Sequence, residues 1–193
     1  KKEEHGGDTS TASSCTSESL FINEVSGAAY NNTMPWFEIY NKGSSCALMS
    51  NFSVKSLSIS TSDNLNNLSE ARTFSLPSVE LKSGGYMIIR GKYTTSNNIT
   101  SSASFAEISD DSSYSPAWGY NGGFIEILKD GKTIDFISFG TDTTSPTSSD
   151  GWTGSAAPKP VFWSTYSKSI ARDSTSSDTN SSSDWTQRTF GTF

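Results

Sequence analysis

Apolar residues in this chain gather in short runs, and turns rich in Gly, Ser, Asn and Pro separate the runs. Several runs alternate apolar with polar positions, which is typical of half-buried β-strands. The best helix candidate, residues 64–71, is short and mostly polar. The pattern therefore predicts an all-β sandwich or barrel. Its expected strands are Leu20–Val25, Trp36–Tyr40, Phe52–Ile59, Arg72–Leu76, Tyr86–Arg90, Phe124–Lys129, Thr133–Phe139, Ser167–Arg172 and Trp185–Phe190.

Two local signals refine this pattern. Asp130-Gly131 stands between two β-type runs, which is the strongest short-range signal for a hairpin. Phe52 and Val54 alternate with polar residues, but Leu57 falls on the opposite parity. We therefore expect a bulge or break near Ser56.

The charge balance disfavours two classes of partner. The chain has 14 Lys and Arg against 20 Asp and Glu, a formal net charge of −6, and no basic stripe. Such a surface repels phosphate backbones and anionic lipids, so we expect no nucleic-acid partner and no binding to anionic membranes.

The compartment is expected from composition and from the start of the chain. No apolar run approaches the roughly 20 residues of a membrane-spanning helix, so we expect no transmembrane segment. The chain begins at Lys1 rather than Met and is rich in Ser, Thr and Asn. We expect an extracytoplasmic protein, secreted or a surface lipoprotein, with its signal removed.

Two cysteines, Cys15 and Cys46, are spaced too far apart for a CxxC-type zinc site. Their even number favours one disulfide, although two free thiols remain the alternative. Residues 1–19 have the composition of a flexible linker. We therefore expect a tail over residues 1–19 and one β-sandwich domain over residues 20–193.

The ordered motifs resemble the lamin-tail domain family, in its bacterial extracellular form. The residues that carry the resemblance run across nearly the whole span after the tail: Ile22-Asn23-Glu24, Trp36–Asn41, Leu48–Phe52, Phe74–Pro77, Leu81–Tyr86, Gly122–Leu128, Gly131–Asp135, Ser169–Arg172, Asp178–Asn180 and Asp184-Trp185. The resemblance implies an immunoglobulin-like antiparallel β-sandwich that serves as a binding or anchoring module. Three segments are longer than a compact member needs: residues 60–71, 91–121 and 141–165.

The sequence offers little for catalysis. His5, the single histidine, lies in the predicted tail, so a Ser-His-Asp or Cys-His mechanism lacks its base. Strand carboxylates could form a glycosidase-like pair, but buried carboxylates more often accept backbone N–H bonds or pair with Arg. We expect structural roles for Glu24, Glu38, Asp135 and Arg172, and no catalytic residue.

Two loop features suggest ligands. Asp178, Asn180 and Asp184 offer oxygen atoms that suit calcium, although Asx turns explain the same residues. Aromatic residues gather in the long segments and either cap one end of the sandwich or contact a ligand. The candidates for ligand contact are Trp118, Tyr120, Trp152 and Trp163.

Two functions follow from these observations. The first is a non-catalytic binding, adhesion or anchoring module outside the cytoplasm, whose partner is a protein or a surface glycan. The second is a carbohydrate-binding or carbohydrate-processing domain that uses the loop aromatics. Exposed, coplanar tryptophan rings would favour sugar, and buried rings would favour a structural role.

Overall fold

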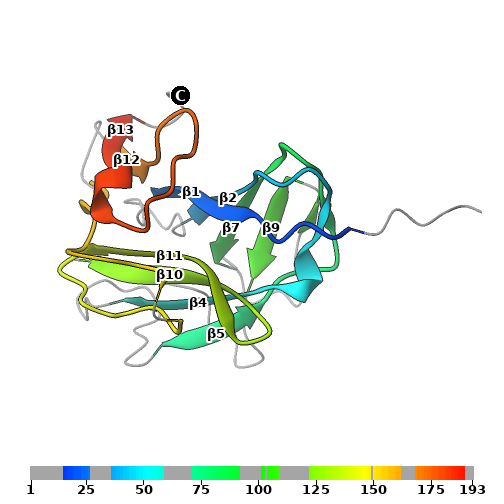
Figure 1. Ribbon diagram of the computed structural model, residues 1–193, viewed down its shortest axis with the longest axis horizontal. Coiled ribbons are helices and arrows are strands. Elements are labelled where there is room, and N and C mark those ends of the chain that lie inside the picture. Colours follow the sequence, from blue (N-terminus) through cyan, green and yellow to red (C-terminus); the bar gives the residue numbers. More distant parts are fainter. Residues whose placement is uncertain are drawn as a thin grey trace, which may run out of the picture.

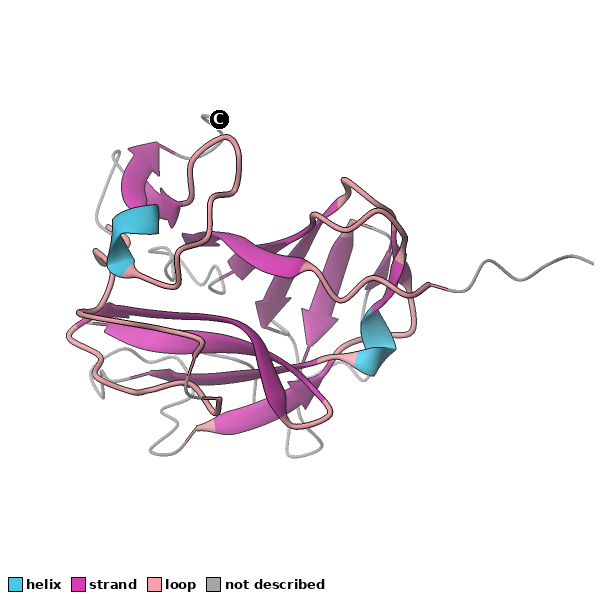
Figure 2. Ribbon diagram, in the orientation of Figure 1, coloured by secondary structure: helices cyan, strands magenta, loops and turns pink. Residues whose placement is uncertain are grey.

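The protein is built from two β-sheets that face each other, as the computed structural model shows (Figure 1). Two single-turn 3-10 helices, η1 (Met49–Asn51) and η3 (Ser182–Asp184), are the helical elements of the described residues (Figure 2). None of the helices in this described part is long and apolar enough to cross a membrane. The structure describes residues 15–26, 36–58, 71–91, 101–102, 104–108, 122–148, 150–161 and 168–189.

The larger sheet has seven strands in the order β13-β12-β1-β2-β7-β9-β8. Its neighbours are antiparallel except for β7 and β9, which run parallel. The exception arises because β9 returns from β8 as an antiparallel partner and lies between β8 and β7. The strands are β1 (Leu20–Ser26), β2 (Trp36–Asn41), β7 (Tyr86–Gly91), β8 (Ser101–Ser102), β9 (Phe105–Ile108), β12 (Lys168–Ala171) and β13 (Thr186–Thr189).

The smaller sheet has four antiparallel strands in the order β11-β10-β4-β5. Its strands are β4 (Ser53–Ser58), β5 (Arg72–Ser75), β10 (Gly122–Lys129) and β11 (Lys132–Gly140). A two-stranded ribbon of β3 (Ala47–Leu48) and β6 (Glu80–Leu81) accompanies the two sheets. These sheets confirm the all-β sandwich that the sequence predicts, and they fit an immunoglobulin-like architecture.

The core lies between the sheets and is filled by the inward residues of both. Phe37, Ile39 and Ile89 on the larger sheet are fully buried, and so are Ile125 and Ile137 on the smaller one. Each such side chain contributes roughly 1.5–3 kcal/mol by leaving water, which makes this layer the main source of stability.

The Asp130-Gly131 hairpin is confirmed. β10 and β11 pair through Lys129 and Lys132, with Asp130 (φ 51°) and Gly131 (φ 74°) between them. Positive φ at both central residues defines a type I′ turn, whose twist matches that of the flanking strands.

The bulge predicted near Ser56 is wrong. β4 pairs with β10 without a register shift from Ser53 to Ser58. Ser56 occupies an inward position, is fully buried, and its hydroxyl has no hydrogen-bond partner. Leu57, whose parity prompted the prediction, lies partly buried opposite Phe124 instead. The strand thus keeps its pairing and places one serine in the core.

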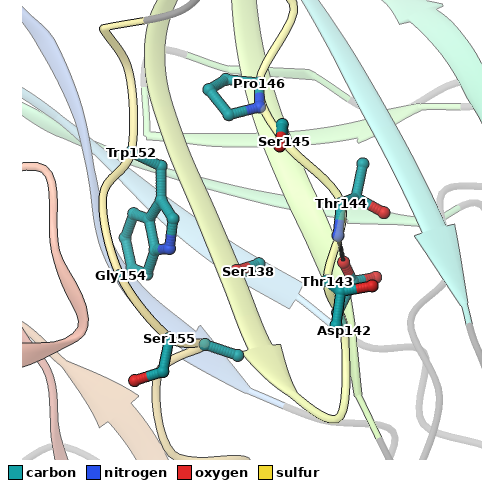
Figure 3. A pocket seen from close by; sticks show the side chains of 10 residues that line it. Ser138, Asp142, Thr143, Thr144, Ser145, Pro146, Trp152, Gly154 and Ser155 are labelled. Atoms are coloured by element: carbon teal, nitrogen blue, oxygen red, sulfur yellow. Dashed lines mark hydrogen bonds between the residues drawn. The ribbon is translucent and has the colours of Figure 1, made fainter.

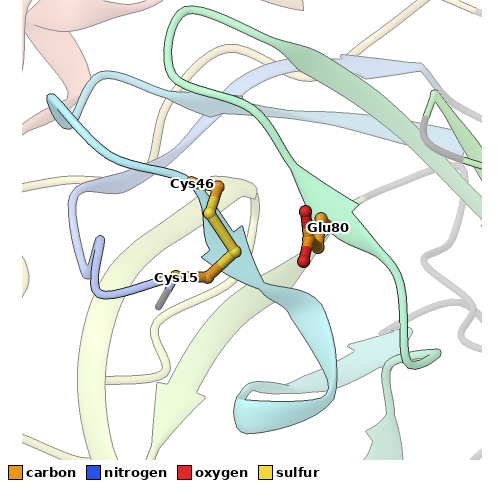
Figure 4. Close-up of side chains that lie close together, drawn as sticks. All are labelled: Cys15, Cys46 and Glu80. Atoms are coloured by element: carbon orange, nitrogen blue, oxygen red, sulfur yellow. A yellow bond between two sulfur atoms is a disulfide. The ribbon is translucent and has the colours of Figure 1, made fainter. Parts of the chain in front are cut away.

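The chain is attached to the sandwich earlier than predicted. Cys15 and Cys46 form a disulfide with a Cα–Cα distance of 4.5 Å, as expected from the sequence (Figure 4). The backbone N–H of Ser17 donates to the carbonyl of Cys46 over 3.0 Å, and Glu18 pairs with Lys129. Residues 15–19 therefore belong to the folded body, and the tail predicted over residues 1–19 is too long. Residues 1–14 lie outside the described residues.

We expect the disulfide to stabilise the fold substantially. The bond spans 31 residues, and closing a loop of this length should stabilise the folded state by about 3–4 kcal/mol. A Cys15→Ser, Cys46→Ser double variant should therefore lose about this much free energy of unfolding in urea. Reducing the wild-type protein should give the same loss, and a loss below about 1 kcal/mol in both would contradict the prediction.

Candidate functional site

The segment after β11 covers the outer face of the smaller sheet. Phe124 and Phe136 are buried on this face with ring centroids 5.7 Å apart. Trp152 meets Phe136 edge to face at 5.8 Å. We call residues 141–148 and 150–157 the cover segment, because this face of the sheet would otherwise expose its aromatic rings to water.

A pocket of about 290 Å³ opens within the cover segment (Figure 3). Trp152 stands on one side and residues 142–145 on the other, with Ser138 of β11 between them (Figure 3). We call it the Asp142–Trp152 pocket. Its lining residues are mostly polar and comprise Ser138, Asp142, Thr143, Thr144, Ser145, Pro146, Trp152, Gly154, Ser155 and Ala156.

Asp142 is the single charged residue in this lining. Its residue surface is only 4% exposed, although charged side chains are rarely buried without a partner. One carboxylate oxygen, Oδ1, accepts the backbone N–H of Thr144 over 2.5 Å in an Asx turn. The other oxygen has no hydrogen-bond partner among the described residues. The pocket thus contains a nearly buried carboxylate with unused acceptor capacity.

Trp152 contributes an unused donor. Its indole Nε1 is buried and has no hydrogen-bond partner in the structure. The nitrogen lies on the side of the ring that faces Ser138 (Figure 3). A buried donor without an acceptor costs about 1–3 kcal/mol, so this pocket is a place where an added acceptor would be stabilising.

The cover segment is held to the sheet by the buried carboxylate of Glu126. This side chain accepts the backbone N–H of Thr147 over 2.6 Å and the hydroxyl of the same residue over 2.9 Å. It also accepts the hydroxyl of Thr133 over 2.6 Å. Thr133 and Ser148 then exchange two hydrogen bonds of 3.0 and 2.8 Å. These contacts fix the base of residues 142–146, which form one wall of the pocket.

The structure describes one of the four aromatic candidates. Trp152 is partly buried, packs against Phe136 and lines the pocket. These contacts fit the capping role, and ligand contact stays a prediction. Trp118, Tyr120 and Trp163 lie outside the described residues.

Sequence reasoning missed Asp142. The available signal was an Asp two residues after the end of β11 and two residues before a backbone N–H that it can accept, in Asp142-Thr143-Thr144. That signal indicates a turn, and only the folded cover segment shows that the carboxylate faces a pocket.

Arg172 organises a second cluster, away from the pocket. Its guanidinium is fully buried and donates to both oxygens of Asp135 over 3.0 and 3.2 Å. It also donates to Asp178 over 3.0 Å and to Asp184 over 3.3 Å, and it lies 4.8 Å from the ring of Trp185. Asp135 and Arg172 thus contact each other directly, which is the kind of pairing that a structural role for both residues predicts.

This cluster bears on the calcium prediction for Asp178, Asn180 and Asp184. Asp178 accepts the backbone N–H of Asn180 over 3.0 Å in an Asx turn. Asp184 accepts the backbone N–H and the hydroxyl of Thr179 over 2.8 and 2.6 Å. In this arrangement the cation beside both carboxylates is the guanidinium of Arg172, and calcium binding stays a prediction.

Glu24 and Glu38 lie directly opposite each other on β1 and β2, next to a register shift in β1. The hydroxyl of Ser169 donates to Glu24, and the side-chain amide of Asn23 donates to Glu38 over 2.8 Å. Burial raises the pKa of both carboxyls, and the charge of Glu24 raises the pKa of Glu38 further. Neither residue lines the Asp142–Trp152 pocket, so we assign them no ligand.

Cys15, Cys46 and Glu80 bring three potential metal-ligand atoms within 4.8 Å of one another (Figure 4). Both sulfur atoms are joined in the disulfide, so neither is a thiolate and the group is no metal site in this form.

Comparison with known proteins gives a likeness in fold. No family model and no curated protein matches the chain by sequence. The structure is similar to the crystal structure of a DUF4876 family protein from Bacteroides thetaiotaomicron, with a TM-score of 0.51 and 13% sequence identity. The likeness covers 89% of this chain and 71% of that chain. At this identity it shows the fold alone.

We expect Arg172→Met to destabilise the protein by about 3–5 kcal/mol, because Asp135 would stay buried without its cation. The matched control is Arg90→Met, since the side chain of Arg90 is 40% exposed in its ion pair with Glu107. The control should lose about 0–1 kcal/mol. Urea unfolding of both variants measures the difference, and equal losses would contradict a special role for the buried pair.

We expect Glu24 and Glu38 to make the protein more stable in mild acid. Their folded-state pKa values are raised above 4.5, so the folded protein binds protons more tightly than the unfolded chain. Their contribution is fully present below about pH 4.5 and is lost as the pH rises through the folded-state pKa.

Glu24→Gln should therefore flatten the fall in unfolding free energy as the pH rises above about 4.5. It should also relieve Glu38 of a neighbouring charge. Glu80→Gln is the control, because Glu80 is exposed. Parallel stability profiles for wild type and Glu24→Gln would show that the burial of this carboxyl has no energetic effect.

Proposed function

We propose that this chain is a non-catalytic binding module that works outside the cytoplasm and holds its ligand in the Asp142–Trp152 pocket. One observation carries the proposal: two polar groups line the same pocket. They are a nearly buried carboxylate, one oxygen of which has no hydrogen-bond partner among the described residues, and a buried indole N–H without an acceptor. Binding sites combine a shaped pocket with a few convergent polar groups of this kind.

The described lining of the pocket has no second carboxyl group beside Asp142, which supports binding rather than catalysis. Acid–base hydrolysis of a glycoside uses two carboxyl groups, and Asp142 is the single carboxylate among the lining residues. The same lining contains no His, Lys, Cys or Tyr that could serve as a second proton donor or acceptor. The carbohydrate-processing alternative therefore finds no support here, whereas carbohydrate binding remains open.

The disulfide supports the proposed compartment. Disulfides form and persist in oxidising environments outside the cytoplasm, and Cys15–Cys46 joins the start of the folded body to the residue that precedes the ribbon strand β3. Secretion and anchoring as a surface lipoprotein are both compatible with this bond. The lamin-tail resemblance stays a prediction, and it agrees with a sandwich that presents its loops to a partner.

The proposal predicts ligand contact at Trp152 without turnover. The probes are a soluble library of monosaccharides, amino acids, alkylamines and carboxylic acids, followed through the indole N–H resonances in ¹H–¹⁵N NMR spectra. Trp152→Phe assigns the resonance of Trp152 among the five tryptophans. We expect at least one compound class to shift that resonance.

Parallel assays with nitrophenyl glycosides, nitrophenyl esters and DNA should show no cleavage. Cleavage that Asp142→Asn abolishes would replace the binding module by an enzyme. A Trp152 resonance that no compound moves at millimolar concentration would remove the pocket from the proposal.

A further inference from the structure

We infer that the Asp142–Trp152 pocket takes one pyranose ring of a neutral glycan, with Asp142 accepting adjacent sugar hydroxyls and Trp152 forming the opposing wall. This inference rests on the proposed function and names its ligand class. It follows from the size of the pocket, from its charge and from its hydroxyl groups.

The size favours a small ring. Pockets for small molecules run from about 300 to 1,000 Å³, and this pocket, at about 290 Å³, lies just below that range. A single sugar unit suits such a volume, whereas a nucleotide or a folded peptide segment requires more space.

The charge of the lining excludes anions. Asp142 is the single charged group among the described residues that line the pocket, and these include no Lys or Arg. A phosphate or carboxylate ligand would face a buried negative charge and find no cation, which is unfavourable in a poorly solvated site. The ligand must therefore be neutral or cationic.

The hydroxyl groups favour a neutral polyol over a cation. Ser138, Thr143, Thr144, Ser145 and Ser155 line the pocket, and each hydroxyl can both donate and accept. A sugar presents the same two-way groups around its ring. An ammonium ion has donors only, so it would leave the hydroxyl donors of the pocket and the Trp152 N–H without acceptors.

Asp142 and Trp152 supply the remaining acceptor and donor groups that would bind a sugar. The carboxylate of Asp142 has about four lone-pair positions, and the Thr144 N–H uses one of them. Neighbouring hydroxyls on one ring can both donate to the remaining positions as charge-assisted hydrogen bonds. A sugar oxygen supplies the acceptor that the indole N–H lacks. The aromatic ring of Trp152 offers an apolar wall to the C–H groups of the sugar.

The test is titration with methyl glycosides of glucose, galactose, mannose and N-acetylglucosamine, read by the Trp152 indole resonance and by calorimetry. Butylammonium chloride serves as the cationic probe. We expect at least one glycoside to bind and to shift the Trp152 resonance. Asp142→Asn should weaken that binding about 10- to 100-fold, because a hydrogen bond to a charged acceptor contributes this much.

Asp130→Asn is the matched control, since it makes the same chemical change in an exposed hairpin turn that Asn-Gly also suits. It should leave affinity unchanged. Trp152→Phe is a second variant, which keeps an aromatic ring against Phe136 but removes the N–H, and it should also weaken binding. Near-ultraviolet circular dichroism checks that each variant keeps its packing.

The outcomes separate the two proposals. Binding of butylammonium with no response to any glycoside would overturn the sugar inference and leave the binding module intact. Glycoside binding that both pocket variants leave unchanged would place the sugar elsewhere and overturn the residue assignment. No response to any probe would count against both proposals.

Discussion

The sandwich depends on one buried ion pair that joins its two sheets. Asp135 comes from β11 in the smaller sheet, and Arg172 follows β12 in the larger one. Between them lies β1, which pairs with β12 only at Glu24 and Val25. Asp135 accepts the backbone N–H of Ile22 over 2.6 Å, and Arg172 donates to the backbone carbonyl of Ile22 over 2.9 Å. A buried backbone N–H and C=O each need a hydrogen-bond partner, and at Ile22 these two side chains supply the partners in place of a neighbouring strand.

The same ion pair also holds the segment between β12 and β13 in place. Three carboxylates surround one guanidinium, and two of them, Asp178 and Asp184, belong to the segment that leads to β13. Burial raises the pKa of Asp135 to about 6, against the opposing effects of Arg172 and of the N–H groups of Ile22 and Phe136. The carboxyl is thus ionised at neutral pH, and the loop carboxylates add to the compensation that Arg172 needs inside the protein.

The sequence predicts the features that local chemistry determines. Strand positions follow from alternation, the β10–β11 hairpin follows from Asp130-Gly131, and the buried roles of Asp135 and Arg172 follow from the cost of isolated charge. Features set by long-range packing could not be predicted. Ser56 keeps its core position because its strand pairs continuously with β10, and β9 lies parallel to β7 because of the chain path through β8. Asp142 is a candidate ligand-binding residue only because the cover segment packs over Phe136 and places this carboxylate in the pocket.

The pocket is preformed because its supports are buried in the sheet. Glu126 on β10 fixes Thr147, and the aromatic pair of Phe124 and Phe136 supports Trp152 from below. Its two walls are therefore held in place without a ligand, so the proposed binding would not carry the entropy cost of ordering a loop. The supporting residues Phe124, Glu126 and Phe136 lie on the regular strands β10 and β11, which hold them precisely, whereas Asp142 and Trp152 lie in the cover segment. Selectivity at the proposed site then depends on matching the second oxygen of Asp142 and the N–H of Trp152, since a ligand that leaves either group unpaired loses the free energy of that hydrogen bond.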